Sequence, residues 1–256
     1  MRAVCIAVVL CLSGVPVRAQ HVAGGSEPVR LSHTLGIQPT STAAGVALHH
    51  RVLALMVEFR EDRDVRTTGT GTFDLSTGLS SDIDPPPHDS GYFASKLRFL
   101  ENYFRKTSRG QLTVSADLFP AVVRLPDSMA VYAPARVGTN APLARLVVDS
   151  WTTAGQLVPS FPFSAYDAFI IFHAGVGRDV DLVNLLGYDP APYDIPSLTL
   201  NLPALRELLQ DPGFDGVPVG SGAARVRNSI ILPETESRVL GTGAFADTLQ
   251  LGINGL

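Results

Sequence analysis

The sequence lacks cysteine beyond its first eleven residues. Its two cysteines, Cys5 and Cys11, both lie in the N-terminal segment. The rest of the chain therefore forms no disulfide, so a hydrophobic core or a bound metal ion must hold it together. With 256 residues the chain is long enough to bury such a core, in one large domain or in a domain with a small lobe.

The sequence also lacks an excess of positive charge. It has 20 Lys and Arg against 24 Asp and Glu, and loss of Arg2 and Arg18 with the N-terminal segment takes the formal net charge from −4 to −6. Nucleic-acid binding relies on basic patches that displace counterions, so we expect no nucleic-acid partner. No later stretch reaches the roughly 20 apolar residues that cross a bilayer, so we expect no membrane association after processing.

The N-terminus has the pattern of an export signal. Arg2 precedes roughly ten apolar residues, and the segment ends in Ala19, which predicts a signal peptide over residues 1–19 and cleavage after Ala19. An uncleaved anchor is a second interpretation, but the apolar run is short for a membrane span. A lipoprotein site at Cys11 is a third, but Leu10 stands where a small residue is needed. We therefore expect a secreted, periplasmic or extracellular protein.

The remaining sequence divides into a lead-in and one domain. Residues 20–48 are rich in Gly, Ser, Thr, Pro and Ala, which predicts a disordered lead-in or the remnant of a propeptide. Residues 49–256 alternate apolar runs with amphipathic stretches. This alternation predicts an α/β (mixed α+β) fold, in which a twisted, mostly parallel sheet carries packed helices.

The predicted elements follow from periodicity. Strands are expected at residues 52–59, 112–118, 168–173 and 229–232, and helices at 90–106, 141–154, 203–210 and from Ala244 onward. Residues 122–125 are expected to return as the hairpin partner of 112–118, residues 67–89 to form a long loop, and residues 229–232 to be an edge or late strand. Ser90 and Asn140 are the expected helix N-caps.

Familiar catalytic motifs are absent from the sequence. It contains no His-Glu-x-x-His run, which would place two zinc ligands and a base on one helix face. Gly175 and Gly177 follow an apolar strand, but Val180 stands where a dinucleotide-binding loop has its third glycine. Ser221 lies between two glycines without the spacing of a nucleophile elbow.

Three residues near the predicted central strand are candidate site residues. His173 ends that strand, where α/β folds build their sites, although a satisfied structural histidine is the more common outcome. Asp179 and Asp181 resemble the start of a calcium loop, but Val183 replaces the next ligand of an EF-hand. An irregular calcium site at Asp179 and Asp181, or at Asp82 and Asp84, is one interpretation, and solvated loop carboxylates are the other.

Three segments together resemble the N-terminal half of immune inhibitor A-type zinc metallopeptidases. The segments are residues 52–59 (VLALMVEF), residues 103–112 (YFRKTSRGQL) with Leu125-Pro126 and Tyr132, and residues 166–175 (YDAFIIFHAG). They are similar to that family's opening strand with its acidic-aromatic end, its helix with a Ser-x-Gly-Gln turn, and its central strand ending in His-Ala-Gly. The resemblance implies a zincin-like fold, a polypeptide substrate and zinc in a full-length parent protein.

In that family a glycine-rich apolar lead precedes the zinc helix. Residues 251–256 (LGINGL) resemble this lead, so we expect a truncated chain that ends before the zinc ligands and the catalytic glutamate. No catalytic residue carries over. Two alternatives stay open: a non-catalytic exported binding or inhibitory module on the same fold, and an enzyme of another class that uses loop carboxylates around Asp167, Asp179 and Asp181.

Overall fold

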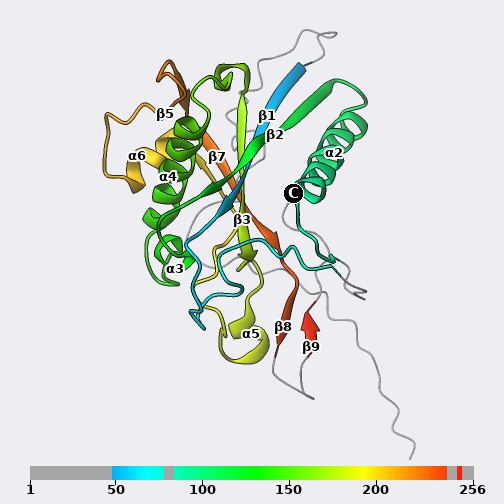
Figure 1. The fold of residues 1–256 in the computed structure, drawn as a ribbon, viewed down its shortest axis with the longest axis vertical. Coiled ribbons are helices and arrows are strands. Elements are labelled where there is room, and N and C mark those ends of the chain that lie inside the picture. The colour runs from blue at the N-terminus through cyan, green and yellow to red at the C-terminus, as the bar shows by residue number, and fades with distance from the viewer. Residues whose placement is uncertain (1–47, 78–83, 241–246, 250–256) are drawn as a thin grey trace, which may run out of the picture.

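A five-stranded sheet forms the centre of the protein (Figure 1). The computed structural model describes residues 48–77, 84–240 and 247–249, so the predicted signal peptide, the lead-in up to residue 47 and the last residues lie outside the described part. The strand order is β2-β1-β3-β7-β4. The strands are β1 (Leu48–Glu58), β2 (Leu112–Arg124), β3 (Ala168–Val176), β7 (Asn228–Thr235) and β4 (Leu198–Asn201).

The sheet is mostly parallel, as its sequence pattern predicts. β1 pairs in parallel with β2 and β3, and β3 pairs in parallel with β7, whereas β4 is antiparallel to β7. All nine residues of β3 are buried, which explains its continuous apolar sequence. The strand predicted at 229–232 is confirmed as the late strand β7, and of the two placements expected for it the edge does not hold, because β7 lies between β3 and β4.

The hairpin expected after residue 118 is also wrong. Residues 112–124 form one continuous strand, β2, which runs parallel to β1 over its whole length. The register shifts between Ala54, which pairs with Leu118, and Met56, which pairs with Val122. This β-bulge accommodates Pro120 within the strand, so the proline bends the ladder instead of reversing the chain.

Helices cover both faces of the sheet (Figure 1). Helix α2 (Ser90–Thr107) lies on one face, where its Phe93 and Leu97 pack in one cluster with Ala54, Met56 and Phe172 of the sheet. The other face carries α3 (Met129–Tyr132), α4 (Ala141–Leu157) and α6 (Leu202–Leu208). Alternate residues of β1 and β3 therefore contribute to two hydrophobic cores, one on each side of the sheet.

The helix caps differ in detail from those expected. Asp89, not Ser90, caps α2, and its carboxylate accepts a hydrogen bond from the Tyr92 N–H. Asn140 holds the N-cap position of α4, but its side chain makes no capping hydrogen bond. An aspartate immediately before the predicted cap competes well for this position, since its carboxylate also suits the positive end of the helix dipole.

Shorter elements complete the described part. They are the 3₁₀ turn η1 (Phe163–Ala165), α5 (Leu182–Leu186), β5 (Val217–Val219), β6 (Ala224–Val226), β8 (Arg238–Leu240) and β9 (Asp247–Leu249). The helix expected from Ala244 is wrong at residues 247–249, which pair with β8 as a strand, while 244–246 and 250–256 lie outside the described residues. Within the described ranges, no helix has the length and apolar character needed to span a membrane.

Candidate functional site

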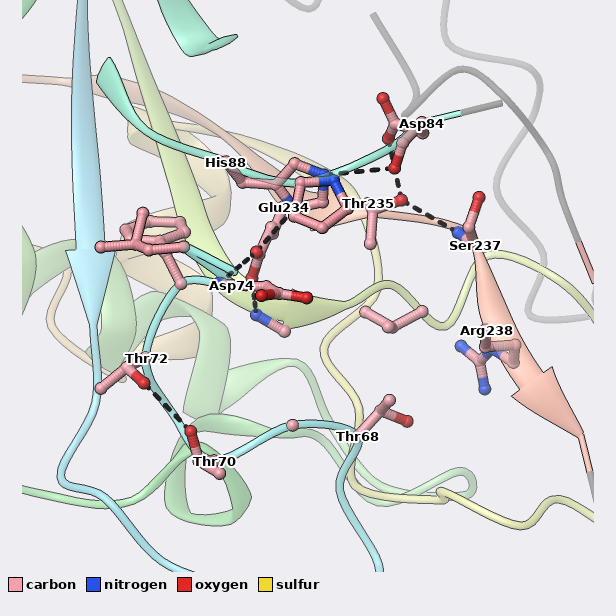
Figure 2. A pocket seen from close by; sticks show the side chains of 16 residues that line it. Thr68, Thr70, Thr72, Asp74, Asp84, His88, Glu234, Thr235, Ser237 and Arg238 are labelled. Atoms are coloured by element: carbon pink, nitrogen blue, oxygen red, sulfur yellow. Dashed lines mark hydrogen bonds and ion pairs between the residues drawn. The ribbon is translucent and has the colours of Figure 1, made fainter. Parts of the chain in front are cut away.

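A pocket of about 560 Å³ lies beyond the carboxyl ends of β3 and β7 (Figure 2). Its walls are the loop 68–75, the segment 84–88, the end of β3 at Gly175 and Val176, and residues 234–238. In open α/β sheets, ligands bind beyond the carboxyl ends of parallel strands, because the loops there converge around one opening. The pocket is therefore the first place to look for function.

One wall of the pocket is a hydrogen-bonded cluster that we name the clasp: Asp84, His88, Tyr92, Glu234 and Thr235. Its centre is the buried carboxylate of Glu234. Oε1 of Glu234 lies 2.7 Å from His88 Nδ1 and accepts a hydrogen bond from the Asp74 N–H at 2.7 Å. Oε2 accepts one from the Gly175 N–H at 2.8 Å. Glu234 thus joins the segment before α2 to the ends of β3 and β7.

The partners of His88 favour its doubly protonated form. Nδ1 faces the Glu234 carboxylate, and Nε2 lies 3.3 Å from the carbonyl oxygen of Asp84, which can only accept a hydrogen bond. Burial alone would lower the pKa of His88, but the hydrogen bond and charge of Glu234 outweigh burial and raise it. His88 and Glu234 therefore form a buried ion pair.

The other carboxylate of the clasp, Asp84, is equally well supplied with donors. Its Oδ2 accepts hydrogen bonds from the Tyr92 hydroxyl at 2.7 Å and from the Thr235 hydroxyl at 2.8 Å, and Lys96 Nζ lies 3.1 Å from Oδ1. Burial would raise the pKa of Asp84, but these three donors together lower it. The Tyr92 ring also lies against the imidazole of His88, with ring centroids 4.3 Å apart.

The polar atoms of His88 and Glu234 all have hydrogen-bond partners within the protein, and this limits the chemistry that the clasp can perform. Both ring nitrogens of His88 and both oxygens of Glu234 are engaged within the protein. A general acid or base needs a free position toward the reacting group. The clasp therefore serves to fix the segment 84–88 onto the end of β7 and to shape the pocket wall, rather than to transfer protons.

Glu236 follows the clasp residues Glu234 and Thr235 in the chain and is also buried, but its hydrogen bonds are incomplete. Neither carboxylate oxygen of Glu236 accepts a hydrogen bond from an N–H or O–H group within the described ranges. Burial is the main cause that raises the pKa of Glu236 to about 9, and the neighbouring Asp179 carboxyl adds to it. Glu236 lies directly on Gly177, where an added Cβ atom would be 1.8 Å from Oε1.

A buried arginine lies two residues further on. Arg238 donates a hydrogen bond to the carbonyl oxygen of Gly177 and forms an ion pair with Asp194 at 3.4 Å, while its Nε and Nη1 have no partner in the described structure. Asp194 also accepts hydrogen bonds from the backbone N–H and hydroxyl of Thr68. Burial raises the pKa of Asp194 to about 6, against the opposing effect of these donors.

His173, the first of the predicted site residues, is a core residue. Its side chain is fully buried, on the face of the sheet that carries α3 and α4, with its ring centroid 6.1 Å from that of Phe59. Nδ1 donates to the carbonyl oxygen of Ala174 at 3.0 Å, and Nε2 has no partner among the described residues. Burial lowers the pKa of His173, so the imidazole is neutral. The structural alternative therefore suits His173 better than a catalytic role.

The predicted carboxylates do not form one site. Asp167 precedes β3 and accepts a hydrogen bond from the Arg51 N–H, whereas Asp179 follows the other end of β3. Nine residues at about 3.3 Å each separate these ends, so an enzyme using both carboxylates is ruled out. Asp181 caps α5 and pairs with Arg136 at 2.9 Å. Asp84 belongs to the clasp, and Asp82 lies outside the described residues.

The described residues do not fit a zinc site. Across these ranges, no group of three or more His, Cys, Asp or Glu side chains is arranged to hold a metal ion. Zinc sites in proteins need at least three such ligands. Among the residues described, the pocket has one imidazole–carboxylate pair, His88 with Glu234. Glu234 Oε1 already contacts His88 Nδ1 and the backbone N–H of Asp74.

The most informative site residues, Glu234 and Glu236, were missed by sequence reasoning. A usable signal existed, because both directly follow the apolar run 229–232, at the end of a strand. The partner His88 lies 146 residues away in a segment without periodicity, so no local pattern could indicate the pair.

Comparison with known proteins adds no assignment. No protein-family model matches this chain, and a search of curated proteins finds no significant match.

Proposed function

We propose that this chain is part of a secreted zinc metalloendopeptidase of the immune inhibitor A type, and that it supplies the sheet and pocket of a zincin-like catalytic domain. The polypeptide substrate would lie in the pocket beyond β3 and β7. Zinc ligands would have to come from outside the described residues, because these hold no group that fits the ion. Any peptide-bond hydrolysis therefore belongs to the complete parent protein.

The observation that carries this proposal is the convergence of the three segments that resemble the family. Phe59, Tyr132 and His173 come from the three separate segments, and their rings meet in one row, with centroids 5.7 Å apart for Phe59 and Tyr132 and 6.1 Å apart for Phe59 and His173. Leu125 joins them through a hydrogen bond from its N–H to the carbonyl oxygen of Glu58. The three segments that resemble the family therefore pack together in one part of the core.

The pocket has suitable chemistry for a polypeptide. The hydroxyls of Thr70 and Thr72 lie 3.0 Å apart on the pocket wall, and Thr70 is exposed. Hydroxyls both donate and accept hydrogen bonds, so they suit the alternating N–H and C=O groups of a peptide backbone. The adjacent clasp holds the opposite wall in place, which reduces the entropy lost on binding.

Isolation of the exported protein from its source cells tests this proposal. We expect tandem mass spectrometry to find residues 49–240 in one polypeptide with a His-Glu-x-x-His sequence, and metal analysis to find about one zinc per molecule. The protein should cleave denatured casein, and 1,10-phenanthroline should abolish the cleavage.

A zinc-free exported protein that binds denatured casein without cleaving it would contradict the enzyme proposal. That result would favour the second candidate, a non-catalytic binding or inhibitory module. The specific observation behind this candidate is the clasp, whose acid and base are both fully engaged within the protein. A pocket wall whose imidazole and carboxylate are engaged with each other suits binding rather than proton transfer.

A further inference from the structure

Glu236 is a buried carboxyl group whose two oxygens are poorly supplied with hydrogen-bond donors. It is 4% exposed, and neither oxygen has a hydrogen-bond partner within the described residues. A buried carboxylate without donors loses its hydration without compensation, which costs several kilocalories per mole in real proteins. Proteins resolve such a cost with a proton, a counter-charge or a bound cation.

Asp179 is the main polar neighbour of Glu236: its carboxyl raises the pKa of Glu236, and its backbone N–H acts in the opposite direction. The Asp179 carboxyl lies within hydrogen-bonding range of the Glu236 carboxyl, and Asp179 itself accepts a hydrogen bond from the Ser197 N–H at 2.8 Å. The hydroxyl of Ser197 is buried and also lacks a partner among the described residues. Asp179 is exposed whereas Glu236 is buried, so the two carboxyl groups have one side within the protein and one side open to solvent.

The charges around Glu236 do not balance. The charged groups that act on Glu236 are Asp179 and Arg238. Arg238 pairs with Asp194, and Arg178 donates to the carbonyl oxygens of Pro134 and Pro192. When Glu236, Asp179, Asp194 and Arg238 are all ionised, their charges sum to −2, which one divalent cation would balance.

We propose that Asp179, Glu236 and the Ser197 hydroxyl form a calcium site at the end of β3. Calcium takes six to eight oxygen ligands in flexible geometry, and water on the exposed side of Asp179 would complete the set. Asp181, the other half of the calcium loop suggested by the sequence, is not a ligand, because its oxygens accept hydrogen bonds from Arg136 and Asn184. The ion would tie the loop after β3 to the segment after β7.

A shared proton is the competing solution. Burial and Asp179 raise the pKa of Glu236 to about 9, so without calcium the pair holds a proton at neutral pH. Calcium binding must then release that proton, and the affinity should rise with pH. Sites with few charged ligands bind calcium with dissociation constants of roughly 0.1–1 mM, which suits an exported protein.

Thermal unfolding of the full chain tests the site. The probes are 10 mM CaCl₂, 10 mM MgCl₂ and EDTA, each at pH 7.5. Calcium at about ten times its dissociation constant should raise the melting temperature by about 3–6 °C over EDTA, and magnesium, which prefers a smaller octahedral site, by less. The variants Glu236→Gln and Asp179→Asn should lose the calcium shift, whereas the neighbouring control Asp181→Asn should keep it.

Two results would overturn the proposal. One is a calcium shift that is equal in Asp179→Asn, Glu236→Gln and the wild type, since the ion would then bind elsewhere. The other is a wild type without a calcium shift whose melting temperature falls between about pH 5 and pH 9 more steeply than that of Glu236→Gln, since a proton alone would then resolve the pair. Should Glu236→Gln fail to fold, the exposed Asp179→Asn decides between these results.

Discussion

Glu234 and Glu236 are two residues apart at the end of the same strand, and both are buried, yet their surroundings are opposite. Glu234 is met by His88 and by the backbone N–H groups of Asp74 and Gly175. Glu236 is met by Gly177 and a second carboxyl group. The backbone N–H of Gly177, which could have donated to Glu236, is already bonded to the carbonyl oxygen of Thr235 at 2.9 Å.

This difference assigns the two residues different roles: Glu234 stabilises the fold, whereas Glu236 is free to bind a ligand. Both oxygens of Glu234 already have hydrogen-bond partners within the protein, so the role of Glu234 is to hold the pocket wall. The oxygens of Glu236 lack hydrogen-bond donors within the part of the chain that the structure describes. A ligand that contacts them gains more binding free energy than at an exposed carboxylate, because folding has already removed their hydration. The two carboxylates should therefore respond in opposite ways to substitution.

The largest effect is expected from Glu234→Ala. The substitution leaves the His88 imidazolium and two backbone N–H groups buried without an acceptor, and breaking a buried ion pair in this way costs about 3–5 kcal/mol of unfolding free energy. Urea denaturation at pH 6 measures the loss. The exposed Glu207→Ala should stay within about 0.5 kcal/mol of wild type. If Glu234→Ala lowers the free energy of unfolding no more than Glu207→Ala does, the clasp does not stabilise the fold.

A smaller loss is expected from Gly177→Ala, which tests the contact between Gly177 and Glu236. The new methyl would collide with Glu236 Oε1 and would also lie 2.7 Å from Pro233 Cγ. Overpacking of this kind costs about 1–3 kcal/mol. In EDTA, a second substitution, Glu236→Ala, should recover part of the loss. Strict additivity of the two substitutions would show that they do not interact.

The clasp should also give a pH signature. The pKa of His88 is raised above its ordinary value of 6.5, so the folded protein binds its proton more tightly than the unfolded chain. The stability contributed by His88 is therefore fully present below pH 6.5 and is lost as the pH rises through the raised pKa. The difference between wild type and His88→Gln, about 1–3 kcal/mol at low pH, should narrow with rising pH. A constant difference would mean that His88 does not titrate in the pair.

The smallest effect is expected at a third buried carboxylate of the same edge, Glu58. Its ion-pair partner Arg124, at 2.9 Å, has a side chain that is 78% exposed. Exposed partners contribute little, so Arg124→Ala should change the free energy of unfolding by less than about 1 kcal/mol, with even less effect in high salt. A loss comparable to that of Glu234→Ala would show that exposure of the partner does not set the scale here.

The sequence was most informative where packing alone determines structure. The strands β1 and β3 could be predicted because their continuous apolar runs are stable only in the interior of the sheet. The helices α2 and α4 could be predicted because their apolar residues recur at helical spacing. The hairpin prediction failed because a β-bulge, which has no simple sequence signature, accommodates Pro120. The three-residue strands β5 and β6 are too short to show a period.

The site was less predictable for a different physical reason. Burial of His88 depends on Glu234, and burial of Asp84 depends on Tyr92, Thr235 and Lys96, so each polar residue is stable only with partners that the fold supplies. Asp179 and Asp181, which the sequence pattern grouped together, have different partners: Asp179 accepts a hydrogen bond from Ser197, whereas Asp181 caps α5 and pairs with Arg136. Spacing along a loop does not determine which oxygen faces which neighbour.

The most direct test of the contrast between Glu234 and Glu236 is a ¹³C NMR titration of the glutamate side-chain carboxyls, assigned with Glu236→Gln. In EDTA the Glu236 signal should titrate near pH 9, and with 10 mM CaCl₂ its titration should move to lower pH as the ion displaces the proton. A Glu236 carboxyl that titrates near its ordinary value of 4.5 and ignores calcium would contradict the account. It would mean that Glu236 is hydrated, and not a buried carboxylate that needs a proton or an ion.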